Sequence, residues 1–132
     1  MTKLNIIGQY LASTSGYRNH TYQLAKALNK LCDVKITTNL FQNWELQCDD
    51  EDLLMINKPD SQDRANLIID LPFNWPAFLG KKNNIGFLVW EGDKIPLSFI
   101  ENIVDNRIKQ VWVPSSHVYD AIKKTLDSIG EI

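Results

Sequence analysis

Short apolar runs alternate with amphipathic segments along most of this sequence, and this alternation restricts the possible fold more than any other feature. Residues 4–8 form an apolar run that leads through a small, polar stretch into a segment with apolar residues at every third or fourth position. That spacing places them on one face of a helix. Residues 34–38 then alternate as a strand does, so the first third predicts a β-α-β unit. The predicted helical face consists of Tyr17, Thr21, Leu24, Leu28 and Leu31.

The middle of the sequence holds two continuous apolar runs, at residues 53–56 and 67–69. Runs of this kind between polar clusters are typical of parallel strands covered on both faces, so we predict a strand at each. The acidic run at residues 49–52 lacks the alternating ligand spacing and turn glycine of a calcium loop, which favours a solvated loop over a cation site. Two prolines interrupt residues 71–76, and we predict a loop there, directly after a strand.

The last third returns to regular alternation of strands and helices. Residues 84–90 and 110–113 are strand-like, and residues 97–104 place apolar side chains on one helical face. A closing helix follows, with Ser115 or Ser116 as its N-cap and Gly130 as a stop signal. The two predicted helical faces consist of Phe99, Ile100, Ile103 and Val104 in the first helix, and of Val118, Ile122, Thr125, Leu126 and Ile129 in the second.

Together these elements predict an α/β fold, namely one doubly wound, Rossmann-like domain with a mostly parallel sheet over residues 1–132. A chain of 132 residues with 44% hydrophobic residues can bury one core but hardly two. Sheets of this class bind their ligands in the loops that follow the strands. The candidate site residues are therefore those at the ends of the predicted strands.

Charge and cysteine content restrict the partners and cofactors. The 14 Lys and Arg residues against 16 Asp and Glu give a net charge of −2, which offers no attraction to nucleic acid or to an anionic membrane. Cys32 and Cys48 are too few for a disulfide framework and lack neighbours at metal-ligand spacing, so we expect reduced thiols, no metal and no cofactor. The N-terminal apolar run is too short for a signal peptide or a membrane span. We therefore expect a cytoplasmic protein, free or peripheral to the inner membrane face.

The loop after the first predicted strand turns on Gly16. Gly8 and Gly16 are eight residues apart, so the glycine-rich dinucleotide turn is missing, and the sequence has no G-x-x-x-x-G-K-[ST] loop. These absences argue against an NAD dehydrogenase and against the usual ATP and GTP machinery. Free amides at the start of the following helix favour an anion site, whereas Ser15 near the N-cap position is equally consistent with a plain capping loop.

Two later strand ends carry aromatic, acidic and hydroxyl side chains. Trp90 and Glu91 follow one strand, where a flat apolar wall beside a hydrogen-bond acceptor suits a sugar ring. A core tryptophan followed by a surface acid is the competing interpretation. Ser115, Ser116 and His117 open the last helix and either cap it or face a ligand. No G-x-S-x-G elbow marks a hydrolase nucleophile, so these residues identify no catalytic group.

Three short motifs follow one another between residues 86 and 121: W-E at 90–91, I-P at 95–96 and V-W-V-P-S at 111–115. In order and spacing they resemble a pattern in family 4 glycosyltransferases of the GT-B fold. The likeness covers the last third of the chain well and the rest loosely.

Elsewhere the likeness to this family is weaker. Gly16-Tyr17 before an amphipathic helix is similar to the family's glycine loop, although the loop is sparser here than the Gly-Gly form frequent in the family. The aspartate common just before the W-V-P-S run is replaced by Lys109 or Gln110. The resemblance therefore rests mainly on residues 86–121.

This resemblance implies retaining transfer of a sugar from a nucleotide-sugar donor, the co-substrate, to a hydroxyl of a glycan or lipid-linked acceptor. In the family the reaction takes place between two Rossmann-like domains. The chain looks like the N-terminal, acceptor-side domain, and the C-terminal domain that binds the donor is missing from it, so we expect no turnover by this chain alone. The implied substrate-binding residues are Ser15, Gly16, Tyr17, Trp90, Glu91 and Ser115.

Two other functions stay open. The first is a non-catalytic α/β module that binds a sugar or nucleotide. The second is a protein-interaction domain that uses the crevice at its strand ends as an interface. A binding module predicts measurable ligand affinity in this chain alone, whereas half of an enzyme predicts weak affinity or none.

Overall fold

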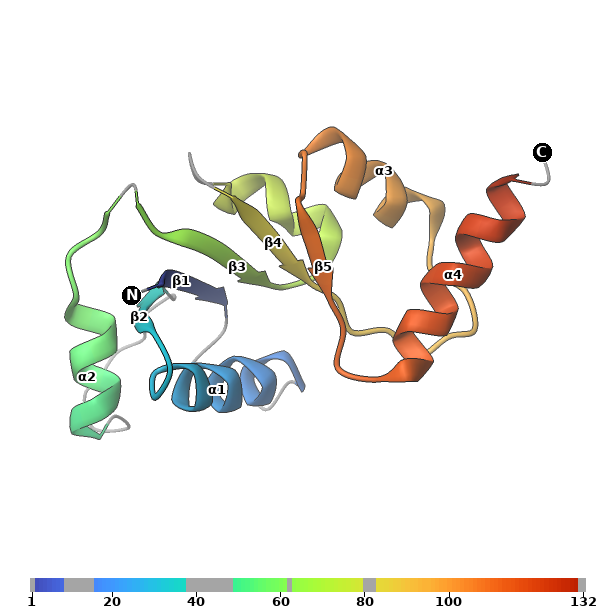
Figure 1. Cartoon of the computed structure of the whole chain (residues 1–132). Coiled ribbons are helices and arrows are strands. Elements are labelled where there is room, and N and C mark those ends of the chain that lie inside the picture. Colours follow the sequence, from blue (N-terminus) through green and yellow to red (C-terminus); the bar gives the residue numbers. More distant parts are fainter. Residues whose placement is uncertain (1, 9–15, 38–48, 62, 80–82, 131–132) are drawn as a thin grey trace.

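The computed structural model describes residues 2–8, 16–37, 49–61, 63–79 and 83–130, with residues 16–20 and 73 described by their backbone only. Its centre is a five-stranded sheet in the order β2-β1-β3-β4-β5, and every neighbouring pair is parallel (Figure 1). The predicted α/β fold with a mostly parallel sheet is therefore confirmed, and the sheet is entirely parallel. The strands are β1 (Lys3–Gly8), β2 (Asp33–Thr37), β3 (Ala65–Ile69), β4 (Asn84–Phe87) and β5 (Gln110–Trp112).

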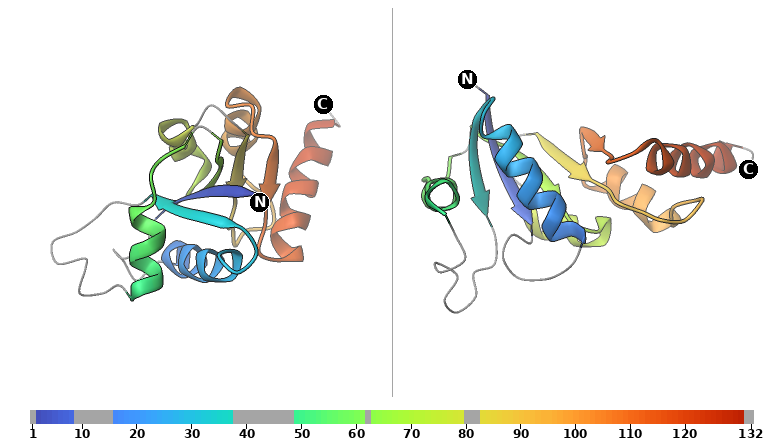
Figure 2. Two further views of the ribbon diagram at one scale, coloured as in Figure 1. Left: turned by 60° about the vertical axis from the view of Figure 1, so that its left-hand side comes forward. Right: turned by 90° about the horizontal axis from the view of Figure 1, so that it is seen from below.

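Helices cover both faces of the sheet because the strand side chains alternate. Ile6 and Leu67 pack with Ala25 of helix α1 (Gly16–Leu28) on one face. Ile7 and Ile68 point the other way and pack with a buried residue of the 3-10 helix η2 (Pro72–Phe78), which lies beside α3 (Leu97–Asp105). Two views in Figure 2 show α2 (Asp50–Asn57) along the outer edge of β2 and α4 (Ser116–Gly130) beyond β5.

The residue that η2 buries is Trp75, which is 0% exposed. Its indole N–H donates to the carbonyl oxygen of Asp70 at 2.9 Å. The ring lies flat against the backbone of β4 at Gly86, where an added Cβ would be 2.3 Å from the nearest ring carbon. Strand β4 therefore needs glycine at this position because the indole occupies the space of a side chain.

A row of side-chain amides crosses the face of the sheet opposite α1. Asn5 of β1 donates to Asn66 of β3 at 3.4 Å, and Asn66 donates to Asn84 of β4 at 3.2 Å. The hydroxyl of Thr37 in β2 donates to the Asn5 carbonyl oxygen at 2.7 Å. Asn5 and Asn66 are each 7% exposed, so buried amides are paired across four neighbouring strands.

Helix α4 packs outside the main sheet core. Its buried residues Val118 and Ala121 form a second core with Leu88 and Phe99, which come from the segment after β4 and from α3. Thr125 of α4 is 3% exposed, and its hydroxyl accepts from the Ile95 backbone N–H at 2.9 Å. The end of the segment between β4 and α3 is therefore fixed to α4, while its start stays paired with β5 through the Leu88 N–H.

Residues 53–56, predicted as a strand, form the centre of helix α2, so that prediction is wrong. The side chain of Asp49 accepts from the Asp52 N–H at 2.8 Å, and the side chain of Asp52 accepts from the Asp49 N–H at 3.1 Å. This reciprocal pair starts the helix. Lys26 of α1 contacts Asp49, Glu51 and the 2% exposed Asp52 at 2.7, 3.1 and 2.8 Å. The acidic run is therefore a helix start that anchors α2 to α1, not a solvated loop.

Other elements follow the predictions with shifted boundaries. The loop predicted at residues 71–76 is mostly helix η2, which accepts Pro72 in its first turn because an N–H there needs no helical partner. The strand predicted at 84–90 ends at Phe87. Leu31, predicted on the face of α1, lies beyond the end of that helix and is 79% exposed, and Val104 of α3 is 68% exposed.

Candidate functional site

The carboxyl ends of the strands form the edge at which this fold class binds ligands. The strand order reverses between β1 and β3, because the chain passes from β1 to β2 on one side and later continues from β3 to β4 on the other. At the end of β1, a Cβ on Gly8 would lie 2.9 Å from the Thr21 hydroxyl oxygen and 3.0 Å from the Ile69 carbonyl oxygen. Helix α1 therefore packs closely against this strand end.

The predicted glycine-loop residues lie partly outside the described structure. Ser15 falls outside the described residues. Gly16 is the first residue of α1 and Tyr17 the second, so both stand at the helix N-terminus that the sequence predicts. The side chain of Tyr17 is not among those described.

Trp90 packs into the second core. Its indole N–H donates to the carbonyl oxygen of Lys94 at 2.7 Å, and its ring meets Phe99 edge-on with 5.2 Å between centroids. A Cβ on Gly92 would lie 2.8 Å from the indole nitrogen. Residues 91–94 are thus folded tightly around the indole. Of the two interpretations of Trp90, packing is the one that these contacts favour.

Glu91 and Ser115 lie on neighbouring loops at the same sheet edge. Strands β4 and β5 are adjacent, and the Leu88 N–H extends their pairing by donating to the Trp112 carbonyl oxygen at 2.9 Å. Nε2 of His117 lies 3.0 Å from the Glu91 carbonyl oxygen, and the Glu91 side chain is exposed. The Ser115 hydroxyl accepts from the N–H of Val118 at 3.5 Å, so this residue caps α4. The structure brings the W-E and V-P-S motifs together.

A pocket of about 560 Å³ lies between α1 and the ends of β4 and β5, and the loop after β5 lines part of it. Phe87 and Trp112 are register partners on the two strands and form its apolar wall. The indole N–H of Trp112 donates to the Gln110 side chain at 3.0 Å. No sequence motif predicted this pocket, although two aromatic residues at the carboxyl ends of consecutive strands were a usable signal. The lining residues are Gln23, Leu24, Phe87, Trp112, Val113 and Pro114.

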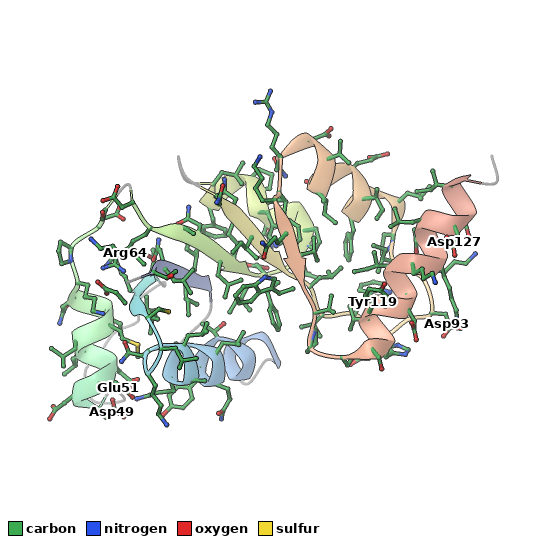
Figure 3. All side chains as sticks on the ribbon, in the orientation of Figure 1. Asp49, Glu51, Arg64, Asp93, Tyr119 and Asp127 are labelled. Atoms are coloured by element: carbon green, nitrogen blue, oxygen red, sulfur yellow. The ribbon has the colours of Figure 1, made fainter. Side chains whose placement is uncertain are left out.

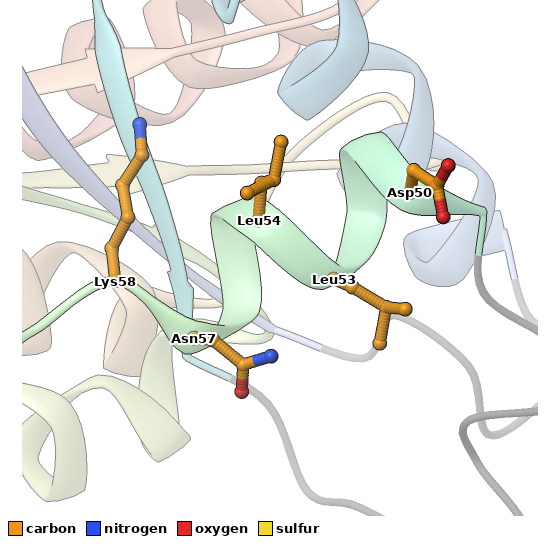
Figure 4. Close-up of a pocket in the computed structure, with 5 residues that line it drawn as sticks. All are labelled: Asp50, Leu53, Leu54, Asn57 and Lys58. Atoms are coloured by element: carbon orange, nitrogen blue, oxygen red, sulfur yellow. The ribbon is translucent and has the colours of Figure 1, made fainter.

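A second hollow of about 500 Å³ lies on the surface of α2 (Figure 4). All of its lining residues come from α2 and the residue that follows it, at the edge of the sheet opposite β5. It is therefore remote from the loops that carry the predicted site residues. The lining residues are Asp50, Leu53, Leu54, Asn57 and Lys58.

A charged cluster around the buried Arg64 lies at the opposite end of the strands from the candidate site. Arg64 is 6% exposed and donates to the Leu4 carbonyl oxygen at 3.1 Å and to the Asp33 carboxylate at 3.2 Å. Lys58 donates to the same carboxylate at 2.7 Å. The hydrogen bond from Lys58, followed by that from Arg64, lowers the pKa of Asp33 below its usual value. This cluster closes the amino ends of β1 and β2 and is structural.

The described part of the chain holds no group of three or more His, Cys, Asp and Glu residues placed to bind a metal ion. No helix within that part combines the length and the apolar character needed to cross a bilayer. Cys32 is free and half-buried, burial raises the pKa of its thiol, and its Sγ lies 3.3 Å from the Leu28 carbonyl oxygen. Cys48 lies outside the described residues.

No known protein family, curated protein or solved structure matches this chain. The all-parallel α/β sheet is shared by proteins of many unrelated functions. The resemblance to glycosyltransferases is therefore a hypothesis, resting on three motifs and on the sheet edge where two of them meet.

Proposed function

We propose that this chain is the acceptor-side half of a retaining glycosyltransferase of the GT-B type, which works together with a separate donor-binding domain. One observation carries the proposal: the W-E and V-P-S motifs lie on the loops after adjacent strands and are joined by the contact between His117 and Glu91. Val113 and Pro114 of the second of these loops line an aromatic pocket at the carboxyl ends of those strands.

In this proposal the pocket receives the apolar part of the acceptor. The half-buried Trp112 offers apolar surface to an apolar aglycone or to the apolar face of a sugar, whereas Phe87 is 4% exposed and adds little. Gln23 supplies an amide at the rim, and the exposed carboxylate of Glu91 accepts hydrogen bonds from sugar hydroxyls. Trp90 positions Glu91, since its own N–H donates to Lys94 and its ring packs on Phe99.

In this proposal another domain binds the nucleotide-sugar donor and stabilises its leaving group. Departure of a nucleoside diphosphate requires positive charge or oriented donors that face the developing charge. Among the described residues of the two loops, 88–95 and 113–117, the ionisable groups that can carry positive charge are Lys94 and His117. Lys94 donates to Ser128 of α4, and His117 contacts the Glu91 backbone. We therefore expect no sugar transfer by this chain alone.

The proposal is tested by titrating the isotopically labelled chain and following its amide resonances. Alkyl glycosides with apolar aglycones are expected to shift the amides of residues 23–24, 87–91 and 112–115 together, whereas nucleotide sugars leave them in place. A Trp112→Ala variant should lose these shifts, and Leu97→Ala on α3 serves as the control because that leucine is 55% exposed and does not line the pocket.

Three outcomes would contradict the proposal. Scattered shifts, or none with any glycoside, remove the pocket as an acceptor site. Tight and saturable binding of a nucleotide sugar by the chain alone favours a complete binding module. Sugar transfer by the chain alone contradicts the need for a donor-binding domain.

A further inference from the structure

The second core covers only part of the apolar face of helix α4. Val118, Ala121 and Thr125 are buried against the second core. Leu126 and Ile129, predicted on one side of the helix with Val118 and Thr125, are 49% and 38% exposed. These two residues continue a line along the helix that we call the α4 stripe: Tyr119, Ile122, Leu126 and Ile129.

The α4 stripe is a continuous surface rather than a set of isolated side chains. Its residues are spaced by three, four and three positions, so they lie in a row about 15 Å long on one side of the helix. Tyr119 is 60% exposed at one end of the row and Ile122 is half-buried. Leu31, after the end of α1, and Leu54, on α2, are exposed elsewhere on the molecule. A continuous exposed apolar row is typical of an interaction surface.

We propose that the α4 stripe binds the α4 stripe of a second copy of this chain, with the two helices antiparallel. This inference does not depend on the proposed function. The spacing three-four-three is the same in both directions, so an antiparallel pair sets Tyr119 against Ile129 and Ile122 against Leu126. Such a self-complementary patch is what a two-fold dimer requires. Helix α4 projects from the end of the molecule beyond β5, which leaves it accessible (Figures 1 and 2).

The charges that flank the α4 stripe complement one another in this arrangement. Lys123 and Asp127 are exposed on the same side of the row, and neither forms a salt bridge within the described residues. Figure 3 labels Tyr119 and Asp127 on α4. In the antiparallel pair the same flank of each helix meets, so Lys123 of each copy lies about 3 Å along the axis from Asp127 of the other. Two equivalent ion pairs then border the apolar contact.

Sedimentation equilibrium on the full chain tests the inference. A contact of one helix per copy is smaller than a standard interface and gives weak binding, so the concentration should run from about 5 to about 500 µM. The weight-average mass should rise from the 15.2 kDa of one chain towards twice that value. Leu126→Lys is expected to weaken self-association at least tenfold. Leu54→Lys on α2, where the leucine is 70% exposed, is the matched control and should leave it unchanged.

Charge reversal tests the orientation of the two helices. Lys123→Asp and Asp127→Lys should each weaken self-association, because each places like charges together in both ion pairs. An equimolar mixture of the two variants should restore a one-to-one dimer, since every pair is then opposite in charge. The proposal is overturned if the chain stays monomeric over the whole concentration range. It is also overturned if Leu126→Lys leaves self-association unchanged. Failure of the mixture to restore the dimer overturns the antiparallel arrangement, and circular dichroism confirms that each variant is folded.

Discussion

Replacing Gly86 by alanine is the smallest change that tests the packing of η2 on the sheet. The added Cβ would lie 2.3, 2.5 and 2.6 Å from three ring carbons of Trp75. Carbon atoms in contact prefer a separation of about 3.5–4.0 Å, so the ring has to move by more than about 1 Å. The ring cannot do this freely, because it is fully buried and its N–H is bonded to the Asp70 carbonyl oxygen.

Two opposing effects decide the size of the stability change. Overpacking a tight core costs about 1–3 kcal/mol. Alanine also restricts the unfolded chain, which stabilises the fold by about 0.4–1 kcal/mol because Gly86 does not have a positive φ. The net expectation for Gly86→Ala is a loss of about 1–2 kcal/mol in the free energy of unfolding. For a chain of this length that corresponds to a fall in Tm of roughly 4–8 °C.

Urea unfolding followed by far-ultraviolet circular dichroism measures this loss, with Val104→Ala on the exposed side of α3 as the control. The clash also predicts a coupling: in a Trp75→Phe background, where the ring is smaller, Gly86→Ala should cost at least about 1 kcal/mol less than in the wild type. A Gly86→Ala protein within about 0.5 kcal/mol of the wild type, or strictly additive effects of the two changes, would refute the packing argument.

Two further changes probe other parts of the fold. Thr125→Val removes the hydroxyl that accepts from the buried Ile95 N–H and should cost about 1–3 kcal/mol, whereas Thr125→Ser should recover most of that stability in the same urea assay. Asp33→Asn should destabilise the fold near neutral pH, because the two cations bonded to this side chain lower its folded pKa. The carboxylate contributes stability above its unfolded pKa of about 3.9 and loses that contribution as pH falls through the lower folded pKa, so the difference between the variant and the wild type should vanish in strong acid. Unfolding free energies measured from neutral to acid pH check this, and a difference that does not change with pH would contradict it.

The strands and most helices could be predicted because their signals are local. The strands predicted at residues 34–38 and 67–69 are short apolar or alternating runs between polar residues, and the structure has strands at Asp33–Thr37 and Ala65–Ile69. Helix α2 could not be told from a strand by its four apolar residues at 53–56, since such a run is compatible with either. The capping pair of Asp49 and Asp52 was the local signal for a helix, and the contact with Lys26 spans 23 residues in sequence.

The candidate site shows the same division between local and distant information. The places of Trp90 and Ser115 after two strands follow from local pattern, and the adjacency of those strands follows from the fold class. Gln23 of α1 lines the pocket only because of how α1 lies against β4 and β5, and no local sequence pattern specifies that packing. The direction of α4, which packs on the second core, likewise depends on contacts such as that of Thr125 with Ile95.

The row of buried amides has a consequence for how the strands find their partners. Parallel strands rich in Ile and Leu pair almost equally well in several registers, because each shift places apolar side chains beside other apolar side chains. Only one alignment of β1, β3 and β4 brings Asn5, Asn66 and Asn84 level with one another. Any slip buries amides without partners, at about 1–3 kcal/mol for each group left unpaired. The row of amides thus specifies the register of the strands, because it destabilises misaligned sheets. Its effect on the choice of register is larger than its contribution to the stability of the correct sheet.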